Sequence, residues 1–465
     1  MKVVKIGGGC LKGIKNIQRI IALVAERCQG DCLVVSALNG ITDTLITGME
    51  KALAAEENIP KIIRHLETVH LKIAGDLMPV GSCFERFTKA LSTGLKDLER
   101  LYYGLNFTRE ITPRMHDIIS SFGERFSAQL LTALLCARKL KAATRMPHQI
   151  GLLTDGRYGD ASADMKGVRS NLPKQINPVL RKKGIAVVPG FYGISTQGEI
   201  TTFGRGGSDY SAAVIAAALG AETLEIWKDV DGFMSADPRM VSEAELIPRL
   251  SYAEAAELSY FGARILHPRT VEPVRKKKIP IVIKNTLAPD NPGSLINSKS
   301  PRHRTVIKSV AHDTDIGILK VHASAVGARP GILARVAGQI TEKGINIKSV
   351  VTSQTCISLL FSKKDVEKAR LALKELKPRP YRRLEKLEHV ALIGIVGEGL
   401  LKKKGVAARC FTAVAGCGVN VEMISFGPSK AALYFLVKLK IFPGRSLLFT
   451  ALFFLIRVVC YSKIS

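Results

Sequence analysis

The sequence predicts an α/β protein with a parallel-rich sheet flanked by helices, followed by two copies of a smaller α+β module. At the start, a strand at 2–6, a glycine turn, a helix at 14–28 and an apolar strand at 32–36 follow one another. This order opens a parallel α/β sheet. Near the other end, similar segments recur at a constant offset of 74 residues (331 to 405), which indicates a duplicated unit.

The composition is that of a globular protein with a basic surface. The 465 residues allow roughly three domains, and 46% hydrophobic with 23% charged residues suits a packed core. The 68 Lys+Arg against 40 Asp+Glu give a net charge of +28. The basic residues form short scattered clusters without an aromatic-interleaved stripe, so we expect a small anionic substrate and no nucleic-acid partner.

The cysteines indicate a reducing compartment. There are nine, an odd number at irregular spacing and without a Cys-x-x-Cys pair. We therefore expect neither a disulfide framework nor a metal site, and small thiols in the core instead. Residues 1–6 are too short and too quickly followed by glycines for a signal peptide. The sequence predicts a cytoplasmic protein.

The first strand ends in a lysine and three glycines. Lys5 precedes Gly7, Gly8 and Gly9, whose backbone amides could hold a phosphate. The spacing is neither that of a P-loop nor that of a Rossmann dinucleotide fingerprint. Lys5 either reaches a phosphate or is a solvated lysine at the edge of the sheet.

A polar turn, 36–43, follows the second strand at the carboxyl end where open α/β sheets bind ligands, although an ordinary surface turn has the same composition. Residues 50 to about 110 are mostly helical by their pattern. We expect 120–125 to interrupt these helices and to place Glu124 in the first turn of a new one. There Glu124 either complements the helix dipole or holds a substrate ammonium.

Three glycines within four residues shape the stretch 203–210. A helix at 211–219 follows, so Ser208 and Asp209 lie near a helix N-terminus, which favours anions. Arg205 can form a fork onto a carboxylate or phosphate. The stretch is either an anion-binding turn that also presents a carboxylate, or a plain turn with Asp209 as a cap.

Further strands are predicted at 185–188, ahead of Phe191, and at 224–227, ahead of Lys228 and Asp229. Asp229 is either a turn residue or a contact to a nucleotide. Ser251 and Glu254 form a capping box. The helix that it opens runs toward Arg264, which either caps carbonyl groups or reaches a nucleotide.

The strand at 279–284 precedes a linker near 289–304. His267, before Pro268, is interpreted as structural because no acid or nucleophile lies near it in sequence.

Each copy of the C-terminal repeat has the pattern strand, helix, strand, strand. Two such modules can pack side by side and leave a site for a small ligand, or the duplication is purely structural. The stretch 446–465 contains an apolar run at 447–456 that is too short for a bilayer span, which takes about 20 residues. A buried strand or helix is expected there, with peripheral membrane contact or a reading-frame change as alternatives.

Taken together, residues 1 to about 440 resemble the aspartate kinases, enzymes with an amino-acid kinase fold and two C-terminal ACT domains. The most specific matches are 204–210, 227–239 and 259–270, followed by Ile283-Lys284-Asn285-Thr286. The resemblance implies an amino-acid kinase domain at 1–300, ACT modules at 315–385 and 388–440, and an atypical apolar tail at 441–465.

The resemblance implies transfer of the ATP γ-phosphoryl group, with Mg2+, to the side-chain carboxylate of aspartate. The product would enter lysine, diaminopimelate, threonine and methionine synthesis. By motif, the catalytic residues would be Lys5 and Asp209. Aspartate would be bound by Ser36, Thr42, Glu124, Phe191, Arg205 and Ser208. ATP would be bound by Lys5, Gly7, Gly8, Gly9, Lys228, Asp229, Met234, Arg239 and Arg264. The resemblance also implies a homodimer through the ACT modules and an amino-acid effector, with no membrane partner.

Several positions depart from the family pattern. Gly9 and Cys10 stand where Thr-Ser is usual, and Lys228, Met234 and Arg264 stand where many members have Thr, Tyr and Lys. Lys228 is similar to the plant-type branch. Lys348 occupies a position that is commonly acidic in the first ACT module, which weakens the inference that lysine inhibits.

Two other functions are therefore kept open. One is another amino-acid kinase, for glutamate or acetylglutamate. The other is an amino-acid-binding regulatory protein with a degenerate kinase site.

Overall fold

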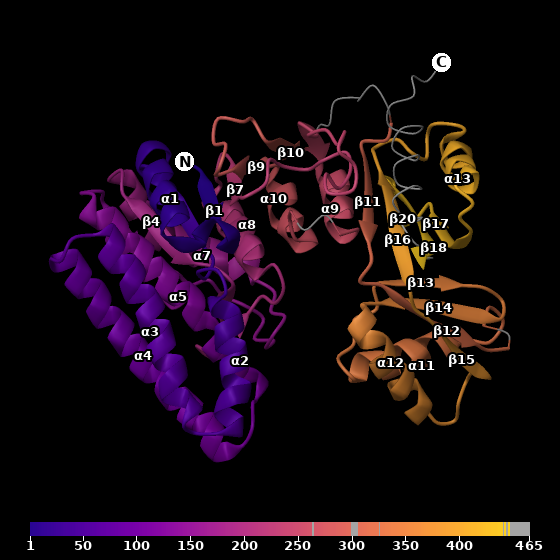
Figure 1. The fold of residues 1–465 in the computed structure, drawn as a ribbon, viewed down its shortest axis with the longest axis horizontal. Helices are drawn as coiled ribbons and strands as arrows, with labels where there is room; N and C mark the ends of the chain where they lie inside the picture. The colour runs from indigo at the N-terminus through magenta and orange to yellow at the C-terminus, as the bar shows by residue number, and fades with distance from the viewer. Residues whose placement is uncertain (263–264, 299–305, 325, 440, 443–444, 447–465) are drawn as a thin grey trace. The chain divides into compact units, whose positions relative to one another are not determined.

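The structure is a computed structural model that describes residues 1–262, 265–298, 306–324, 326–439, 441–442 and 445–446 (Figure 1). The chain divides into two compact units. The first is Met1–Phe233, Leu246–Ala256 and Arg264–Ser300; the second is Met234–Glu245, Glu257–Ala263 and Pro301–Ser465.

An eight-stranded sheet forms the centre of the first unit, in the order β3-β4-β2-β1-β7-β9-β10-β8. Every pairing in it is parallel except that between β9 and β10. The strands are β1 (Val3–Ile6), β2 (Cys32–Val35), β3 (Ala142–Thr144), β4 (Ile185–Pro189), β7 (Leu224–Lys228), β8 (Arg249–Ser251), β9 (Ile281–Asn285) and β10 (Ser294–Asn297). The predicted parallel-rich sheet is confirmed, with β1 in its interior.

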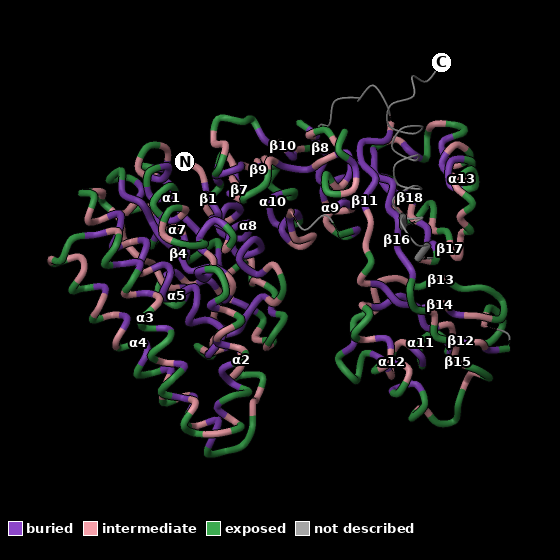
Figure 2. The backbone as a smooth tube through the Cα atoms, viewed as in Figure 1, coloured by how far each residue is buried: buried purple, intermediate pink, exposed green. Residues whose placement is uncertain are grey.

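Helices cover both faces of this sheet. One face of the sheet forms a single hydrophobic core with five helices: α1 (Gly13–Arg27), α2 (Ile41–Ala54), α3 (Asn58–Leu77), α4 (Ser82–Thr108) and α5 (Pro113–Ala137). The helix α8 (Gly207–Leu219) contacts β1, β2 and β7, and in turn packs on α7 (Met165–Arg181) and α10 (Val271–Lys277). Burial follows this arrangement: the neighbouring strands β1, β2 and β4 are buried along their whole length, and the long helices α3 and α4 expose one side (Figure 2).

Alternation along the strands decides which side chains reach α8. Val4 and Ile6 belong to the core with α1–α5, and so does Trp227 on the neighbouring strand. Successive side chains of a strand point to opposite faces. Lys5 and Lys228 therefore point to the other face, toward α8.

The expected interruption at 120–125 is wrong, because α5 runs through it unbroken from Pro113 to Ala137. Buried Ile119, Phe122 and Phe126 continue one apolar stripe across the stretch. The glycine there marks a close approach of two elements and not a break: a Cβ at Gly123 would lie 2.8 Å from Cβ of Ala37. Glu124 consequently lies in the middle of α5 and not in a first turn.

Short elements complete the first unit. The strands β5 (Tyr192–Ile194) and β6 (Ile200–Thr202) form a hairpin, α6 covers Pro147–Ile150, and 3-10 turns cover Gly8–Leu11 and Pro268–Thr270. The predicted capping box is present at the start of α9 (Tyr252–Tyr260): the Ser251 amide donates to Glu254 Oε2 at 2.7 Å, and the Glu254 amide donates to Ser251 Oγ at 3.2 Å.

Two four-stranded antiparallel sheets form the second unit, in the orders β13-β14-β12-β15 and β11-β16-β18-β17. The first contains β12 (Gly317–His322), β13 (Ser349–Thr352), β14 (Cys356–Phe361) and β15 (Arg383–Leu387), with α11 (Ile332–Glu342) and α12 (Lys363–Glu375). The second contains β11 (Ser309–Asp313), β16 (Val390–Val396), β17 (Val421–Phe426) and β18 (Ala432–Lys438), with α13 (Val406–Gly416). A short pair, β19 (Ile441–Phe442) and β20 (Arg445–Ser446), follows.

The internal repeat is confirmed, because both copies have the order strand, helix, strand, strand. Gly331 and Gly405, the first residues of the repeated pattern, each precede the helix in a left-handed conformation, with φ of 88° and 78°. The expected boundaries 315–385 and 388–440 leave out one strand, however. β11 precedes the first module in sequence yet pairs with β16 of the second.

The apolar tail beyond residue 446 lies outside the described residues. Among the helices that are described, none has the length and apolar content needed to cross a bilayer.

Candidate active site

Two lysines from neighbouring strands converge on one carboxylate of α8. Lys5 Nζ lies 2.6 Å from Asp209 Oδ1, and Lys228 Nζ lies 3.6 Å from Asp209 Oδ2. The Lys5 contact is an ion pair without the alignment of a hydrogen bond. Lys5 and Asp209 are each 5% exposed. A solvated edge lysine and a simple helix cap are therefore both excluded, and the N-cap of α8 is Gly206.

The charges of this triad are mutually dependent. Burial alone would raise the pKa of Asp209, but the charges of Lys5 and Lys228 outweigh it, so the pKa of that carboxyl is lowered. Burial lowers the pKa of Lys228. Attraction to Asp209 opposes this shift, whereas repulsion from Lys5 adds to it. One carboxylate thus holds two cations side by side, which leaves an excess positive charge beside the glycine turn.

The glycine turn lies directly against these side chains. A Cβ at Gly7 would lie 3.2 Å from the Trp227 carbonyl oxygen, and the Gly7 amide donates to that oxygen at 3.1 Å. Gly8 and Gly9 open a 3-10 turn, where the first amides have no partner inside the helix. Of the predicted phosphate-binding amides, those of Gly8 and Gly9 are therefore the ones available to a ligand.

The turn before α8 is the second glycine-dependent feature. Gly204 and Gly206 have φ of 70° and 72°, a region that side chains disfavour. A Cβ at Gly206 would lie 2.3 Å from Cβ of His267, and one at Gly204 would lie 2.7 Å from the Gly159 carbonyl oxygen. Arg205, between these two glycines, is exposed. His267, interpreted as structural from the sequence, accepts a hydrogen bond from the Arg269 amide through its side chain.

Sequence reasoning missed two residues that hold this turn in place. Asp117, fully buried on α5, accepts hydrogen bonds from the Gly159 amide at 2.8 Å and the Thr202 amide at 2.7 Å. Arg269 donates to the carbonyl oxygens of Phe203 at 3.0 Å and Ala161 at 2.6 Å. Asp117 could have been found from the sequence, because it is a charged residue within the apolar stripe of α5. No local sequence feature marks Arg269 as a residue that holds the turn.

Glu124 lies close to the start of α8. It is 4% exposed, and its Oε1 accepts from Ser208 Oγ at 3.4 Å. Its Oε2 is buried without a hydrogen-bond partner among the described residues. Burial raises the pKa of Glu124 to about 7, and the opposing effects are, first, backbone amides, with that of Ala37 the largest, and then Ser208 and Lys5. A buried acceptor that lacks a donor is suited to a cationic ligand group.

The other predicted substrate residues lie on several elements of the first unit. The Ser36 carbonyl oxygen accepts from Ser127 Oγ at 2.5 Å, which ties the end of β2 to α5. Thr42 is the second residue of α2. Phe191 has a φ of 74°, which is uncommon for an aromatic residue, and its ring lies 2.9 Å from where a Cβ at Gly207 would be.

The predicted nucleotide residues are only partly brought together. Asp229 is exposed, and its Oδ2 lies 3.0 Å from where a Cβ at Gly9 would be. The second unit contains Met234, whose carbonyl accepts from Ser309 Oγ at 2.8 Å, and Arg239, which forms a bidentate pair with Asp237. Arg264 lies outside the described residues. Cys10 is buried and donates to the Trp227 carbonyl at 3.5 Å.

Comparison with known proteins identifies the two parts of the chain. Residues 1–285 match the model of the amino acid kinase family, and residues 393–441 match an ACT domain. The chain is 30% identical to aspartokinase 2, chloroplastic, of Arabidopsis thaliana over 455 residues, which cover 94% of this chain and 81% of that protein. It is also 30% identical over 448 residues to the bifunctional aspartokinase/homoserine dehydrogenase of Haemophilus influenzae, covering 93% of this chain and 54% of that protein.

Solved structures are similar over nearly the whole chain. E. coli aspartokinase III in complex with aspartate and ADP superposes with a TM-score of 0.81 at 27% identity, covering 94% of this chain and 96% of that one. The same enzyme in complex with lysine and aspartate gives a TM-score of 0.79 at 26% identity, with 99% of each chain covered.

Proposed function

The chain belongs to the amino acid kinase family and, within it, to the aspartokinases; from this premise we propose that it transfers the γ-phosphoryl group of ATP to the side-chain carboxylate of L-aspartate. The product is 4-phospho-L-aspartate, the first intermediate on the route to lysine, diaminopimelate, threonine and methionine. The observation that supports this most strongly is the Lys5–Asp209–Lys228 triad beside the glycine turn, in which Lys5 and Asp209 are buried.

The triad suits phosphoryl transfer because this reaction depends on alignment and charge stabilisation more than on covalent chemistry. In our proposal, Lys5 stabilises the charge on the moving phosphoryl group. Asp209 acts as the residue that orients Lys5 and Lys228. The nucleophile is the carboxylate of the substrate, which is already ionised near neutral pH, so no general base is required.

Aspartate is proposed to lie between α5, α8 and the ends of β2 and β4. Arg205 pairs with one of its carboxylates. Glu124 accepts from its ammonium, and the unsatisfied Oε2 supports this role. Ser36, Thr42, Phe191 and Ser208 enclose the remaining surface.

ATP is proposed to place its terminal phosphates on the amides of Gly8 and Gly9, with Lys228 and Asp229 beside them. Mg2+ would enter with the nucleotide and neutralise phosphate charge. Asp209 is already paired with two lysines, so Asp229, an exposed carboxylate next to Gly9, is the residue that fits the metal. We also propose that Met234, Arg239 and Arg264 contact the nucleotide and that the catalytic domain covers 1–300.

Regulation is proposed to act through the two α+β modules. The Lys348 ammonium pairs with Asp313 at 3.0 Å, and Ser349 Oγ lies 2.9 Å from the Tyr434 hydroxyl. These contacts join the first module to strands of the second. An amino acid bound to one module would therefore affect the conformation of both. Inhibition of the purified protein by lysine or threonine, measured separately, tests this point.

We further propose a homodimer formed by the modules. β13 and β17 are edge strands of their sheets, and each carries exposed apolar side chains, Val350 on one and Ile424 and Phe426 on the other. Uncovered apolar edges favour pairing with a second chain. A monomeric mass in light scattering would contradict this.

A coupled ADP-release assay with aspartate, glutamate and acetylglutamate tests the main proposal. We expect turnover with aspartate alone. Turnover with either of the others would indicate a different amino-acid kinase, and tight binding of lysine or threonine without any turnover would indicate a sensor.

A further inference from the structure

A pocket of about 510 Å3 lies between α2 and α3, lined by residues of these helices outside the proposed substrate and nucleotide sites. Its volume falls within the range of small-molecule sites, roughly 300 to 1,000 Å3. The catalytic proposal gives it no role.

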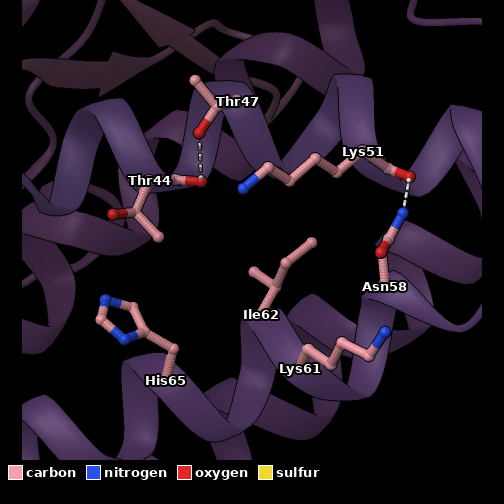
Figure 3. A pocket seen from close by; sticks show the side chains of 8 residues that line it. Thr44, Thr47, Lys51, Asn58, Lys61, Ile62 and His65 are labelled. Atoms are coloured by element: carbon pink, nitrogen blue, oxygen red, sulfur yellow. Dashed lines mark hydrogen bonds between the residues drawn. The ribbon is translucent and has the colours of Figure 1, made fainter.

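The charged and titratable side chains that line this pocket are all basic. Lys51 comes from α2, whereas Lys61 and His65 come from α3, one turn apart. In Figure 3 the Lys51 amine and the His65 ring point into the pocket from opposite sides. No carboxylate belongs to the lining in the described part of the chain. Such a concave, single-sign surface concentrates counter-ions.

The two lysines are also left without acidic partners. Neither Lys51 nor Lys61 forms an ion pair with any residue that the structure describes. Glu57 stands four residues before Lys61, the usual spacing for a helical ion pair, yet no pair forms. The positive charge is therefore available to a ligand.

The rest of the lining is held in place by the protein itself. Asn58 Nδ2 donates to the Lys51 carbonyl at 3.0 Å, and Thr47 Oγ1 donates to the Asp43 carbonyl at 2.8 Å. Buried Gly48 and Ile62 supply a non-polar part, with Ile62 near the centre (Figure 3). A Cβ at Gly48 would lie 2.7 Å from the Tyr102 hydroxyl, so the wall behind it is closely packed.

We infer that this pocket binds a small anion bearing carboxylate or phosphate groups, with Lys51 and Lys61 on its acidic groups and its carbon skeleton against Ile62. The site lies outside the proposed aspartate and nucleotide contacts, and it stands whether or not the protein is a kinase. Because α2 also carries Thr42, a bound anion would contact the same helix as the substrate.

Isothermal titration calorimetry on the full chain tests the site, without added ADP or aspartate, because both are anions that could themselves occupy this pocket. Succinate and inorganic phosphate serve as separate probes, which distinguishes a carboxylate ligand from a phosphate ligand. We expect at least one of them to bind at one site per chain. The double variant Lys51→Gln/Lys61→Gln should weaken that binding about tenfold or more, since two charge-assisted contacts are lost.

The control is Lys72→Gln/Lys96→Gln, which removes the same net charge from exposed positions of α3 and α4. Unchanged binding in this control, with an unchanged melting temperature in both variants, supports a defined site. Equal binding by all three proteins, an equal loss in both variants, or no binding of either probe overturns the inference. The comparison between variants remains valid if no kinase activity is found.

Discussion

Lys5 Nζ and Asp209 Oδ1 lie 2.6 Å apart, although their residues are separated by most of the first unit. Strand alternation points Lys5 away from the core that contains Val4 and Ile6, and α8 brings Asp209 to the same face. Two charges out of water are stable only when paired. The pair therefore fixes the position of the cation that we propose as catalytic.

Arg205→Ala is expected to raise the KM for aspartate about tenfold or more with a smaller change in kcat, because a bidentate contact to a carboxylate is lost. Steady-state kinetics at varied aspartate and saturating ATP measure this. Arg181→Ala, at the exposed end of α7, is the matched control and should leave the KM unchanged. An unaltered KM in the Arg205 variant would remove this residue from the aspartate site.

Aspartate binding is expected to weaken as the pH falls below about 7. Burial raises the pKa of Glu124 to about 7, and only the ionised form can pair with an ammonium. The KM for aspartate should therefore rise toward acid pH, and Glu124→Gln should have a high KM with a flatter pH profile. A pH profile identical in the wild type and in this variant would show that Glu124 does not contact the substrate ammonium.

Gly206→Ala is expected to destabilise the protein more than Gly13→Ala. Both glycines have a φ of 72°, so both substitutions incur the left-handed backbone strain, about 1–2 kcal/mol. A Cβ at Gly206 also meets His267 at 2.3 Å, whereas one at Gly13 meets nothing within 4 Å. Denaturant unfolding of the two variants measures the difference. An equal decrease in the free energy of unfolding in the two variants would mean that His267 can move away from the new Cβ without destabilising the protein.

Stability is expected to fall below about pH 6.5 partly because of His70. Nδ1 of this buried histidine donates to the Leu66 carbonyl oxygen at 2.7 Å, and burial lowers the pKa of His70 to about 4. Between about pH 6.5, the ordinary pKa of a histidine, and about pH 4, His70 binds a proton in the unfolded chain but not in the folded chain. The free energy of unfolding should therefore fall with decreasing pH, by up to about 1.4 kcal/mol per unit.

Calorimetric melting temperatures at several pH values check this expectation. His70→Leu should show a shallower dependence between about pH 6.5 and 4 than the wild type. Parallel curves for the two proteins would exclude His70 as a source of the acid sensitivity.

Local patterns predicted much of this molecule. The strand, glycine turn and helix around Lys5 and the repeat at Gly331 and Gly405 were visible in sequence, because periodicity and glycine positions are local signals. The ion pair of Asp209 with Lys5 and Lys228 was not, since it depends on which face each strand presents to α8. Gly123 was misinterpreted as part of a helix break, because its close contact with Ala37 is a tertiary feature. The membership of β11 in the second sheet is likewise a long-range pairing.

The most direct test of the account is the turnover of Lys5→Ala with aspartate in the coupled ADP-release assay. Lys12→Ala, an exposed lysine shortly after the same glycine turn, is the control. The account predicts that kcat falls about a hundredfold or more in the Lys5 variant, by loss of a charge-stabilising donor, and stays near the wild-type value in the control. A folded Lys5→Ala protein that turns over aspartate at the wild-type rate would contradict it.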